Sequence, residues 1–110
     1  MATIRERLRG AGRHGLPGGG RRHGPYRYLP PRGYNSRAPL PRGPNGGFLD
    51  RFGNEWCEGP AHGRAAADGF TREWDVQLSP QGVNRWGRFA KSGVGGQRYV
   101  NVTPQGRLSH

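Results

Sequence analysis

The sequence contains one cysteine, Cys57, and four scattered histidines. A single cysteine excludes an intramolecular disulfide, and these residues show none of the spacings that are typical of a zinc site. The start of the sequence lacks the apolar core of a signal peptide, and no stretch contains the roughly 20 apolar residues that a membrane span requires. We therefore expect a domain stabilised by packing alone, with no cofactor, no metal, no signal peptide in this chain and no membrane contact.

Hydrophobic residues are also scarce. They make up 31% of the 110 residues, whereas glycine and proline number 21 and 10. A chain of this length holds one domain at most. Because its glycine and proline content is in the range of disordered or low-complexity sequences, we expect part of the chain not to fold.

Acidic residues are few, since 7 Asp and Glu oppose 18 Lys and Arg and leave a net charge of +11. All basic residues except Lys91 are arginines, whose planar guanidinium groups bind phosphate oxygens in pairs and stack on bases. This charge indicates a polyanionic partner, and we expect nucleic acid, in particular RNA, ahead of an acidic protein or an anionic membrane. The alternative is a solvated basic tail without a specific partner.

The positive charge is concentrated in residues 1–47, which carry a net charge of +9, against +2 for residues 48–110. Residues 1–47 also contain seven of the ten prolines and few aliphatic residues, so we expect a disordered basic arm. Three tyrosines lie among its arginines, in a mixture that suits stacking on single-stranded bases: Tyr26, Tyr28 and Tyr34. A flexible linker is the alternative.

Residues 48–110 carry eight of the eleven aromatic residues, so a hydrophobic core is possible there. The clearest pattern is the alternation in residues 70–78, which places Trp74, Val76 and Leu78 on one face of a strand. Ser79 and Pro80 suit the N-cap and the first position of a helix. We expect a hairpin at 48–56, a loop at 59–69, a strand at 70–78, a short helix from 80, a turn at 92–96, and strands at 98–103 and 107–110. This order predicts an α+β domain with a small, mostly antiparallel sheet and one short helix.

The other face of the strand at 70–78 carries two carboxylates, Glu73 and Asp75, at a spacing of roughly 7 Å. In a partly dry cleft each would raise the pKa of the other, and a carboxylate with a raised pKa can act as a general base at neutral pH. If the neighbouring strand pairs in register, Tyr99 and Asn101 point onto the same face. Charges on the open side of an antiparallel sheet also occur without a catalytic role, so this pattern leaves both interpretations open.

A series of short motifs runs through the second half of the chain. They are Asp50-Arg51-Phe52-Gly53-Asn54-Glu55-Trp56, Gly59-Pro60, Glu73-Trp74-Asp75-Val76-Gln77-Leu78-Ser79, Gly82, Trp86-Gly87, Gly93, Asn101-Val102, Gly106 and the terminal His110. In order and spacing, residues 48–110 resemble the bacterial polymorphic toxin type 17 domain. The resemblance implies a ribonuclease toxin at the C-terminal end of a secreted protein, delivered into the cytoplasm of a target cell. It also implies an acidic immunity protein that keeps the toxin harmless in the producing cell.

The segment Glu73-Trp74-Asp75-x-Gln77 is also similar to the nuclease domain of cloacin and the ribosome-cutting colicins, in which an Asp and a Glu on a twisted sheet act with a His. That similarity implies a catalytic role for Asp75 alone. Leu78 stands where the colicin family has a histidine, and the downstream acid of that family is missing. In the type 17 family a histidine often precedes the Asn-Val pair, and this chain has Tyr99 near that position.

Together, the resemblance and the polar face predict a monomeric, metal-independent ribonuclease that cleaves RNA by attack of the 2′-hydroxyl. Asp75 or Glu73 is expected to be the base and His110 the acid. His110 would share a face with Leu108 in a regular terminal strand, so it reaches the polar face only if the chain end bends. The expected RNA-binding residues are Arg72, Arg85, Arg98 and Tyr99. A non-enzymatic RNA-binding protein and an inactive remnant of a longer toxin are the alternatives.

Overall fold

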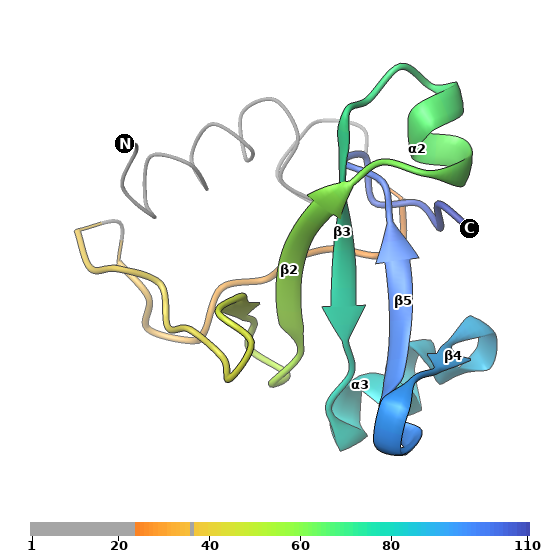
Figure 1. The fold of residues 1–110 in the computed structure, drawn as a ribbon. Helices are drawn as coiled ribbons and strands as arrows, with labels where there is room; N and C mark the ends of the chain where they lie inside the picture. Colours follow the sequence, from red (N-terminus) through yellow and green to blue (C-terminus); the bar gives the residue numbers. More distant parts are fainter. Residues whose placement is uncertain (1–23, 36) are drawn as a thin grey trace.

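The computed structural model describes residues 24–35 and 37–110, which form a five-stranded sheet with short helices (Figure 1). The strands are β1 (Phe48–Leu49), β2 (Glu55–Pro60), β3 (Arg72–Gln77), β4 (Lys91–Ser92) and β5 (Arg98–Val102). The helices are α2 (Gly63–Ala67) and α3 (Pro80–Trp86), with two 3₁₀ turns, η1 (Gly87–Phe89) and η2 (Val94–Gly96). Every strand pair is antiparallel, which confirms the α+β class expected from the sequence.

The strands lie in the order β1-β2-β3-β5-β4, so β3 is central. Asp75 of β3 lies opposite Cys57 of β2 and Asn101 of β5, and Gln77 lies opposite Tyr99. Residues paired across an antiparallel sheet point to the same side, so these five side chains share one face. The strands therefore pair in the register that places Tyr99 and Asn101 on the face of Asp75, which was the condition stated from the sequence.

Helix α3 begins where the sequence indicates. Ser79 is its N-cap, because the Ser79 hydroxyl accepts a hydrogen bond from the N–H of Gly82 at 3.0 Å, and Pro80 occupies the first turn. The same hydroxyl donates to the carbonyl of Phe52 at 2.5 Å. The cap therefore fixes both the start of α3 and its contact with the turn between β1 and β2.

Three local features differ from the sequence-based expectation. The expected loop contains the short helix α2. Strand β4, whose Lys91 lies opposite Tyr99, was not expected and ends where the expected turn begins; that turn contains η2. The prediction of a terminal strand at 107–110 is wrong. These residues follow a tight turn, and Leu108 forms only an isolated bridge with Val102. Each of these features has too few residues to show a hydrophobic period, so contacts with the rest of the domain determine its conformation.

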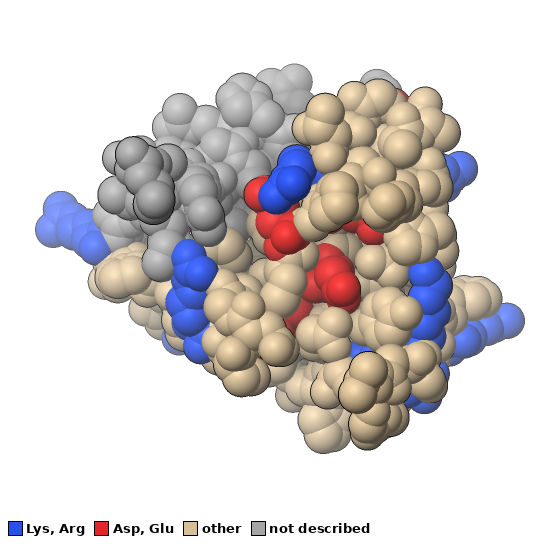
Figure 2. Space-filling model, in the orientation of Figure 1, with Lys and Arg blue, Asp and Glu red and all other residues tan. Residues whose placement is uncertain are grey.

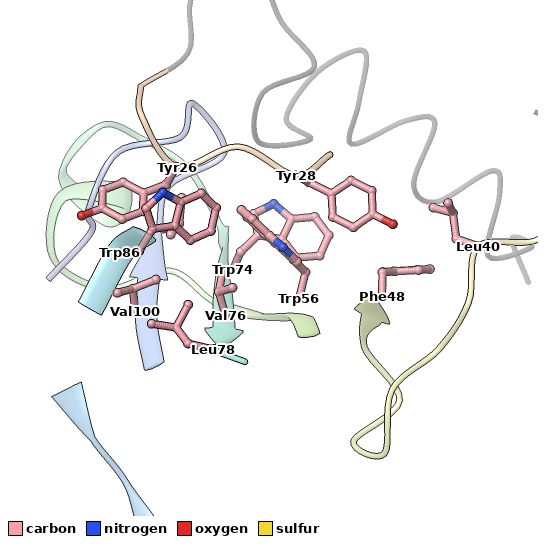
Figure 3. Close-up of a cluster of buried hydrophobic side chains, with 11 residues drawn as sticks. Tyr26, Tyr28, Leu40, Phe48, Trp56, Trp74, Val76, Leu78, Trp86 and Val100 are labelled. Carbon is pink, nitrogen blue, oxygen red and sulfur yellow. The ribbon is translucent and has the colours of Figure 1, made fainter. Parts of the chain in front are cut away.

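Aromatic rings form the core on the face of the sheet opposite Asp75 (Figure 3). Trp56 meets Trp74 and Trp86 edge to face, with ring centroids 6.1 and 6.0 Å apart. Aromatic pairs in this geometry attract each other beyond the effect of the area they bury. Trp74 and Trp86, which are 4% and 8% exposed, are both core residues, and for Trp74 this agrees with the face on which the alternation in residues 70–78 placed it.

Two tyrosines upstream of β1 belong to the same core. Tyr28 is 3% exposed, packs edge-on against Trp56 at 5.8 Å, and donates its hydroxyl hydrogen to the carbonyl of Leu49 at 2.8 Å. Tyr26 packs against Trp86 at 5.3 Å. Figure 3 shows both rings beside the tryptophans. Their side chains are therefore core components, where the sequence had suggested surfaces for stacking on bases.

Two parts of the chain upstream of β1, residues 24–30 and 40–47, contact the rest of the domain. The N–H of Gly24 donates to the carbonyl of Gln105, and Leu40 is buried against the core. The folded unit therefore begins upstream of the boundary expected at Gly47. Residues 1–23 of the expected arm lie outside the described part of the chain.

Asp50 organises the turn between β1 and β2. Its Oδ1 accepts the N–H groups of Phe52 and Asn54, and its Oδ2 accepts the side-chain amide of Asn54 and the indole N–H of Trp56, all at 2.9–3.0 Å. A buried carboxylate that accepts four hydrogen bonds from its own chain is a structural group. The first of the sequence motifs, residues 50–56, therefore shapes the hairpin and fixes it to the core.

Candidate active site

The face of the sheet that points away from the core is polar. Every second residue of β3 lies on it, namely Glu73, Asp75 and Gln77. Figure 2 shows acidic side chains gathered in the middle of this side of the molecule, with Lys and Arg side chains around the margin. Basic side chains around the margin can bind an anionic chain, and a carboxylate at the centre can then accept a proton from it.

Glu73 connects three segments of the chain. Its Oε1 accepts the N–H of His62 at 2.9 Å and the hydroxyl of Ser109 at 2.8 Å, and its Oε2 lies 2.8 Å from Nε2 of His110. Burial alone would raise the pKa of Glu73, but these hydrogen bonds outweigh it and hold the pKa below its ordinary value. The expectation that each acid raises the pKa of the other is therefore wrong for Glu73.

His110 reaches the polar face because the chain bends after Leu108. The carbonyl of Ser109 accepts the N–H of Arg64 at 2.7 Å, and its hydroxyl oxygen accepts the N–H of Ala65 at 3.1 Å, so the bend is anchored to α2. The His110 side chain remains 35% exposed, whereas that of Glu73 is 4% exposed. The pair thus joins a buried carboxylate to an imidazole that a ligand can reach.

Lys91 completes this group from β4. Its ammonium nitrogen lies 2.8 Å from Nδ1 of His110, 3.3 Å from Oδ1 of Asn101 and 5.9 Å from the centre of the Tyr99 ring. An ammonium group can only donate, so Nδ1 accepts from Lys91 and Nε2 carries the hydrogen that Glu73 accepts. This arrangement fixes the tautomer of His110 through both of its ring nitrogens.

Asp75 lies beside this group on β3. Burial raises the pKa of Asp75 above its ordinary value; the charge of Glu73 adds to the effect, and a hydrogen bond from Gln77 with the charges of Lys91 and His110 opposes it. The predicted raising of one acid by the other is therefore confirmed for Asp75. Gln77 donates to Oδ1 of Asp75 at 2.8 Å and holds the carboxylate in place.

The three arginines expected at the site lie elsewhere. Arg72 pairs with Glu58 at 3.4 Å, and Arg85 on α3 stacks over the ring of Phe52 at 4.1 Å. The guanidinium group of Arg98 donates to the carbonyls of Gly87 and Ala90 at 2.8 and 3.3 Å. By the alternation of the strands, Arg72 and Arg98 lie on the side opposite Asp75. Of the expected site residues, the structure brings together Glu73, Asp75, Tyr99 and His110.

Sequence reasoning missed Lys91, His62 and Ser109. Lys91 is the only lysine in the chain, and this rarity is the one signal that could have drawn attention to it. His62 lies next to His110, with ring centroids 5.9 Å apart, and Ser109 donates to Glu73. These two residues enter the site through α2 and the bent chain end, and neither of these local structures has a recognisable sequence pattern.

A hollow of about 570 Å³ lies next to Asp75 on the same face. It is lined by Asn45, Cys57, Asp75, Gln77, Gly93, Val94, Gln97 and Tyr99. We call it the amide hollow because three of its side chains are amides. A volume of this size is within the range of small-molecule binding sites.

Two further findings concern the described residues. Within residues 24–35 and 37–110, no group of three or more His, Cys, Asp or Glu side chains is arranged to hold a metal ion. The helices of this part of the chain include none that is long and apolar enough to cross a membrane.

Comparison with known proteins gives one family. The sequence model of the family described as Novel toxin 17 matches residues 5–110. The match begins well upstream of Phe48, where the resemblance in the motifs starts, and it includes the hairpin, β3 and the bent chain end. No curated protein and no solved structure matches the chain. Because the family match covers nearly the whole sequence, the chain belongs to the Novel toxin 17 family and is a toxin domain.

Proposed function

We propose that this toxin domain is an endoribonuclease that cleaves RNA by attack of a 2′-hydroxyl on the adjacent phosphorus, without a metal ion. Such a reaction needs a base for the hydroxyl, an acid for the leaving oxygen and a cation for the charge on the phosphate. The observation that carries the proposal is the presence of all three groups on one face: Asp75, His110 and Lys91.

Asp75 is the proposed base. Its carboxylate is half-buried at the wall of the amide hollow, where an RNA strand can approach it, and its raised pKa makes it a stronger base than an ordinary aspartate. Glu73 is less suited to this role, because its oxygens already accept hydrogen bonds from His62, Ser109 and His110.

His110 is the proposed acid, and Glu73 positions it. Because Glu73 accepts the hydrogen on Nε2, Nδ1 is the nitrogen that exchanges a proton with the substrate. In the reaction the 2′-oxygen bonds to phosphorus and gives its proton to Asp75. When Lys91 moves to the phosphate, Nδ1 takes a proton from water, so that His110 meets the leaving group as an imidazolium ion with Glu73 at Nε2. The bond from phosphorus to the 5′-oxygen breaks, and the leaving oxygen takes this proton from Nδ1. The products are a 2′,3′-cyclic phosphate and a 5′-hydroxyl end.

Lys91 supplies the positive charge. In the free protein its ammonium group lies at Nδ1 of His110 and at Oδ1 of Asn101. A phosphate group competes with these two neutral acceptors for the ammonium group, since a hydrogen bond between two charged groups is stronger. Binding of substrate therefore draws Lys91 away from Nδ1 and opens that nitrogen to the leaving oxygen.

The proposal extends to partners and delivery. The domain acts as a monomer at the end of a larger toxin that carries it into the cytoplasm of a target cell. An acidic immunity protein covers the basic rim in the producing cell. The net charge of +11 supports both an RNA substrate and an acidic inhibitor, because each is attracted to the same positive surface.

The decisive experiment is cleavage of bacterial RNA and tRNA by the full chain in EDTA, with Asp75→Asn beside the wild type. The substitution keeps the shape of the side chain and removes the basic lone pair. We expect the rate to fall on the order of 10²–10⁴-fold and the wild-type products to carry 2′,3′-cyclic phosphate ends. Glu58→Gln is the matched control, because Glu58 is an exposed acid that pairs with Arg72 away from the site.

Two results would overturn the mechanism: loss of wild-type cleavage in chelator, or Asp75→Asn cutting as fast as wild type. A wild-type protein that binds RNA and never cuts it would support the non-enzymatic alternative. One that neither cuts nor binds would support the inactive remnant.

A further inference from the structure

The amide hollow lies beside the proposed catalytic group, and the proton transfers do not use it. Asp75 belongs to its wall, so a molecule in the hollow lies against the carboxylate. The chemistry of the other lining groups indicates which molecule fits.

The side-chain amides of the hollow are already oriented by the protein. In each of them the nitrogen donates to a fixed acceptor: Asn45 to Glu55 Oε1 at 3.0 Å, Gln77 to Asp75 Oδ1 at 2.8 Å, and Gln97 to the carbonyls of Leu78 and Arg98 at 3.0 Å. Within the described chain, none of their three carbonyl oxygens accepts a hydrogen bond. The lining therefore offers these three amide oxygens and the Asp75 carboxylate as acceptors, beside the hydroxyl of Tyr99 and the weakly donating thiol of Cys57.

The same hollow contains one aromatic surface. Tyr99 is partly exposed, and Gly93 lies against its ring, since a Cβ at Gly93 would lie 3.3 Å from ring carbon Cε1. Val94, at the start of η2, is 98% exposed beside it. An exposed ring next to a short apolar loop is a suitable stacking surface for a flat heteroaromatic group.

We infer that the amide hollow binds a nucleobase with two adjacent N–H donors, which among the four RNA bases is guanine. Guanine carries the donors N1–H and N2–H₂ side by side. Uracil has one N–H between two acceptors, and adenine and cytosine each place one amino group next to an acceptor. A hollow of fixed acceptors leaves unpaired polar groups with those three bases, and unpaired groups oppose binding. The inference rests on the proposed function for its choice of RNA as ligand.

The order of residues along β3 relates this base to the reaction. Gln77, Asp75 and Glu73 follow one another on the same face at intervals of roughly 7 Å, which is about the distance from a base to its 3′-phosphate. With guanine beside Gln77 and Tyr99, the ribose lies near Asp75 and the phosphate lies toward His110 and Lys91. The predicted cleavage is therefore on the 3′ side of guanosine.

The test is binding of single nucleotides, which requires no catalysis. The full chain is titrated with the 3′-monophosphates of guanosine, adenosine, cytidine and uridine, and the affinities are measured by nuclear magnetic resonance. We expect the guanosine nucleotide to bind on the order of tenfold more tightly than the other three. In the wild type its binding should shift the amide signals of Val94 and Gln97 more than those of α3.

Two variants locate the site. Tyr99→Leu removes the ring, and Gln77→Met removes one acceptor, so each should weaken binding of the guanosine nucleotide on the order of tenfold. Tyr99→Phe keeps the ring and is the matched control. Equal affinities for all four nucleotides, or a guanosine preference that both variants retain, would overturn the inference. If a variant does not fold, the wild-type spectra test the site: the inference holds if the guanosine nucleotide shifts the amide signals of Val94 and Gln97 more than those of α3, and fails otherwise.

The outcomes also separate this inference from the proposed function. Guanosine binding in a protein that never cuts RNA would support the hollow and reject the ribonuclease. Cleavage after all four nucleotides at equal rates would support the ribonuclease and reject the guanine site.

Discussion

Asp50, in the turn between β1 and β2, and Asp75, on β3, differ in their surroundings. Asp50 is 4% exposed and accepts four hydrogen bonds from its own hairpin. Among the described residues, Asp75 accepts one, from Gln77, and its carboxylate borders an open hollow. A carboxylate that the protein has saturated with donors is fixed in place, whereas one that retains acceptor capacity can take a proton from a ligand.

Glu73 lies between these two cases. It is as deeply buried as Asp50 and accepts hydrogen bonds from three segments, yet one of its partners is the reachable imidazole of His110. The polar face therefore contains its own supporting group, and the proposed activity of Asp75 and His110 would depend on a carboxylate that positions His110.

The largest effect on stability should come from the core face. Tyr28→Ala removes a ring that packs on Trp56, and we expect the free energy of unfolding to fall by about 3–5 kcal/mol, as for other aromatic-to-alanine core changes. Urea unfolding measures it. Tyr34→Ala is the control, because Tyr34 is only partly buried against the same core. Equal, small losses in both variants would mean that the segment before β1 does not stabilise the domain.

The two aspartates should respond differently to the same change. Asp50→Asn puts an amide group among four donors, so at least one of them loses its acceptor, and we expect a loss of about 2–4 kcal/mol in unfolding free energy. Asp75→Asn should raise the thermal melting temperature only slightly at neutral pH while it slows cleavage on the order of 10²–10⁴-fold. If Asp75→Asn destabilised the domain as much as Asp50→Asn, the distinction between a structural and a reactive carboxylate would fail.

The smallest effect is the dependence of stability on pH. The pKa of Glu73 is lowered from 4.5 in the folded state, so its contribution is present above that value and is lost as the pH falls through the folded pKa. The pKa of Asp75 is raised from 3.8, so its ionised form opposes folding above the folded pKa and this penalty disappears in acid. We expect Glu73→Gln to lose stability, and Asp75→Asn to gain it, at neutral pH.

Unfolding free energies of both variants and the wild type, measured from neutral pH down to about pH 3, test these signs. At neutral pH Glu73→Gln should have a lower unfolding free energy than wild type and Asp75→Asn a higher one, and both differences should become smaller in acid. Differences of the same sign at neutral pH would contradict the pKa shifts on which the choice of Asp75 as base depends.

The sequence predicted the parts of the fold that repeat a pattern over several residues. Alternation in β3 and β5 and the Ser79-Pro80 cap were sufficient for the central strands and α3, and parity alone placed Asp75, Asn101 and Tyr99 on one face. The sequence did not predict α2, β4 or the bend before His110. Helix α2 and the bend depend on contacts between residues far apart in the chain, and β4 has only two residues, too few to show a pattern.

Two other expectations failed for the same physical reason. Tyr26 and Tyr28 lie in a segment rich in arginine and proline. Composition describes the segment as a whole and does not show which of its side chains pack against the tryptophans. The arginines chosen for charge alone lie away from the polar face, where local acceptors such as the carbonyl of Gly87 hold them. A single lysine with two acceptors in reach is at the site instead.

The bonds around Glu73 also determine when the site forms during folding. They connect positions separated by 11, 36 and 37 residues, and the Ser109 hydroxyl reaches His62 across 47. Closing loops of such length costs chain entropy and occurs late, after the local hairpin has formed. In a chain that has formed only its hairpin and α3, His110 is not yet held beside Glu73 and Asp75. The proposed activity therefore requires the final stage of folding, and we expect a chain that stops before this stage to be inactive.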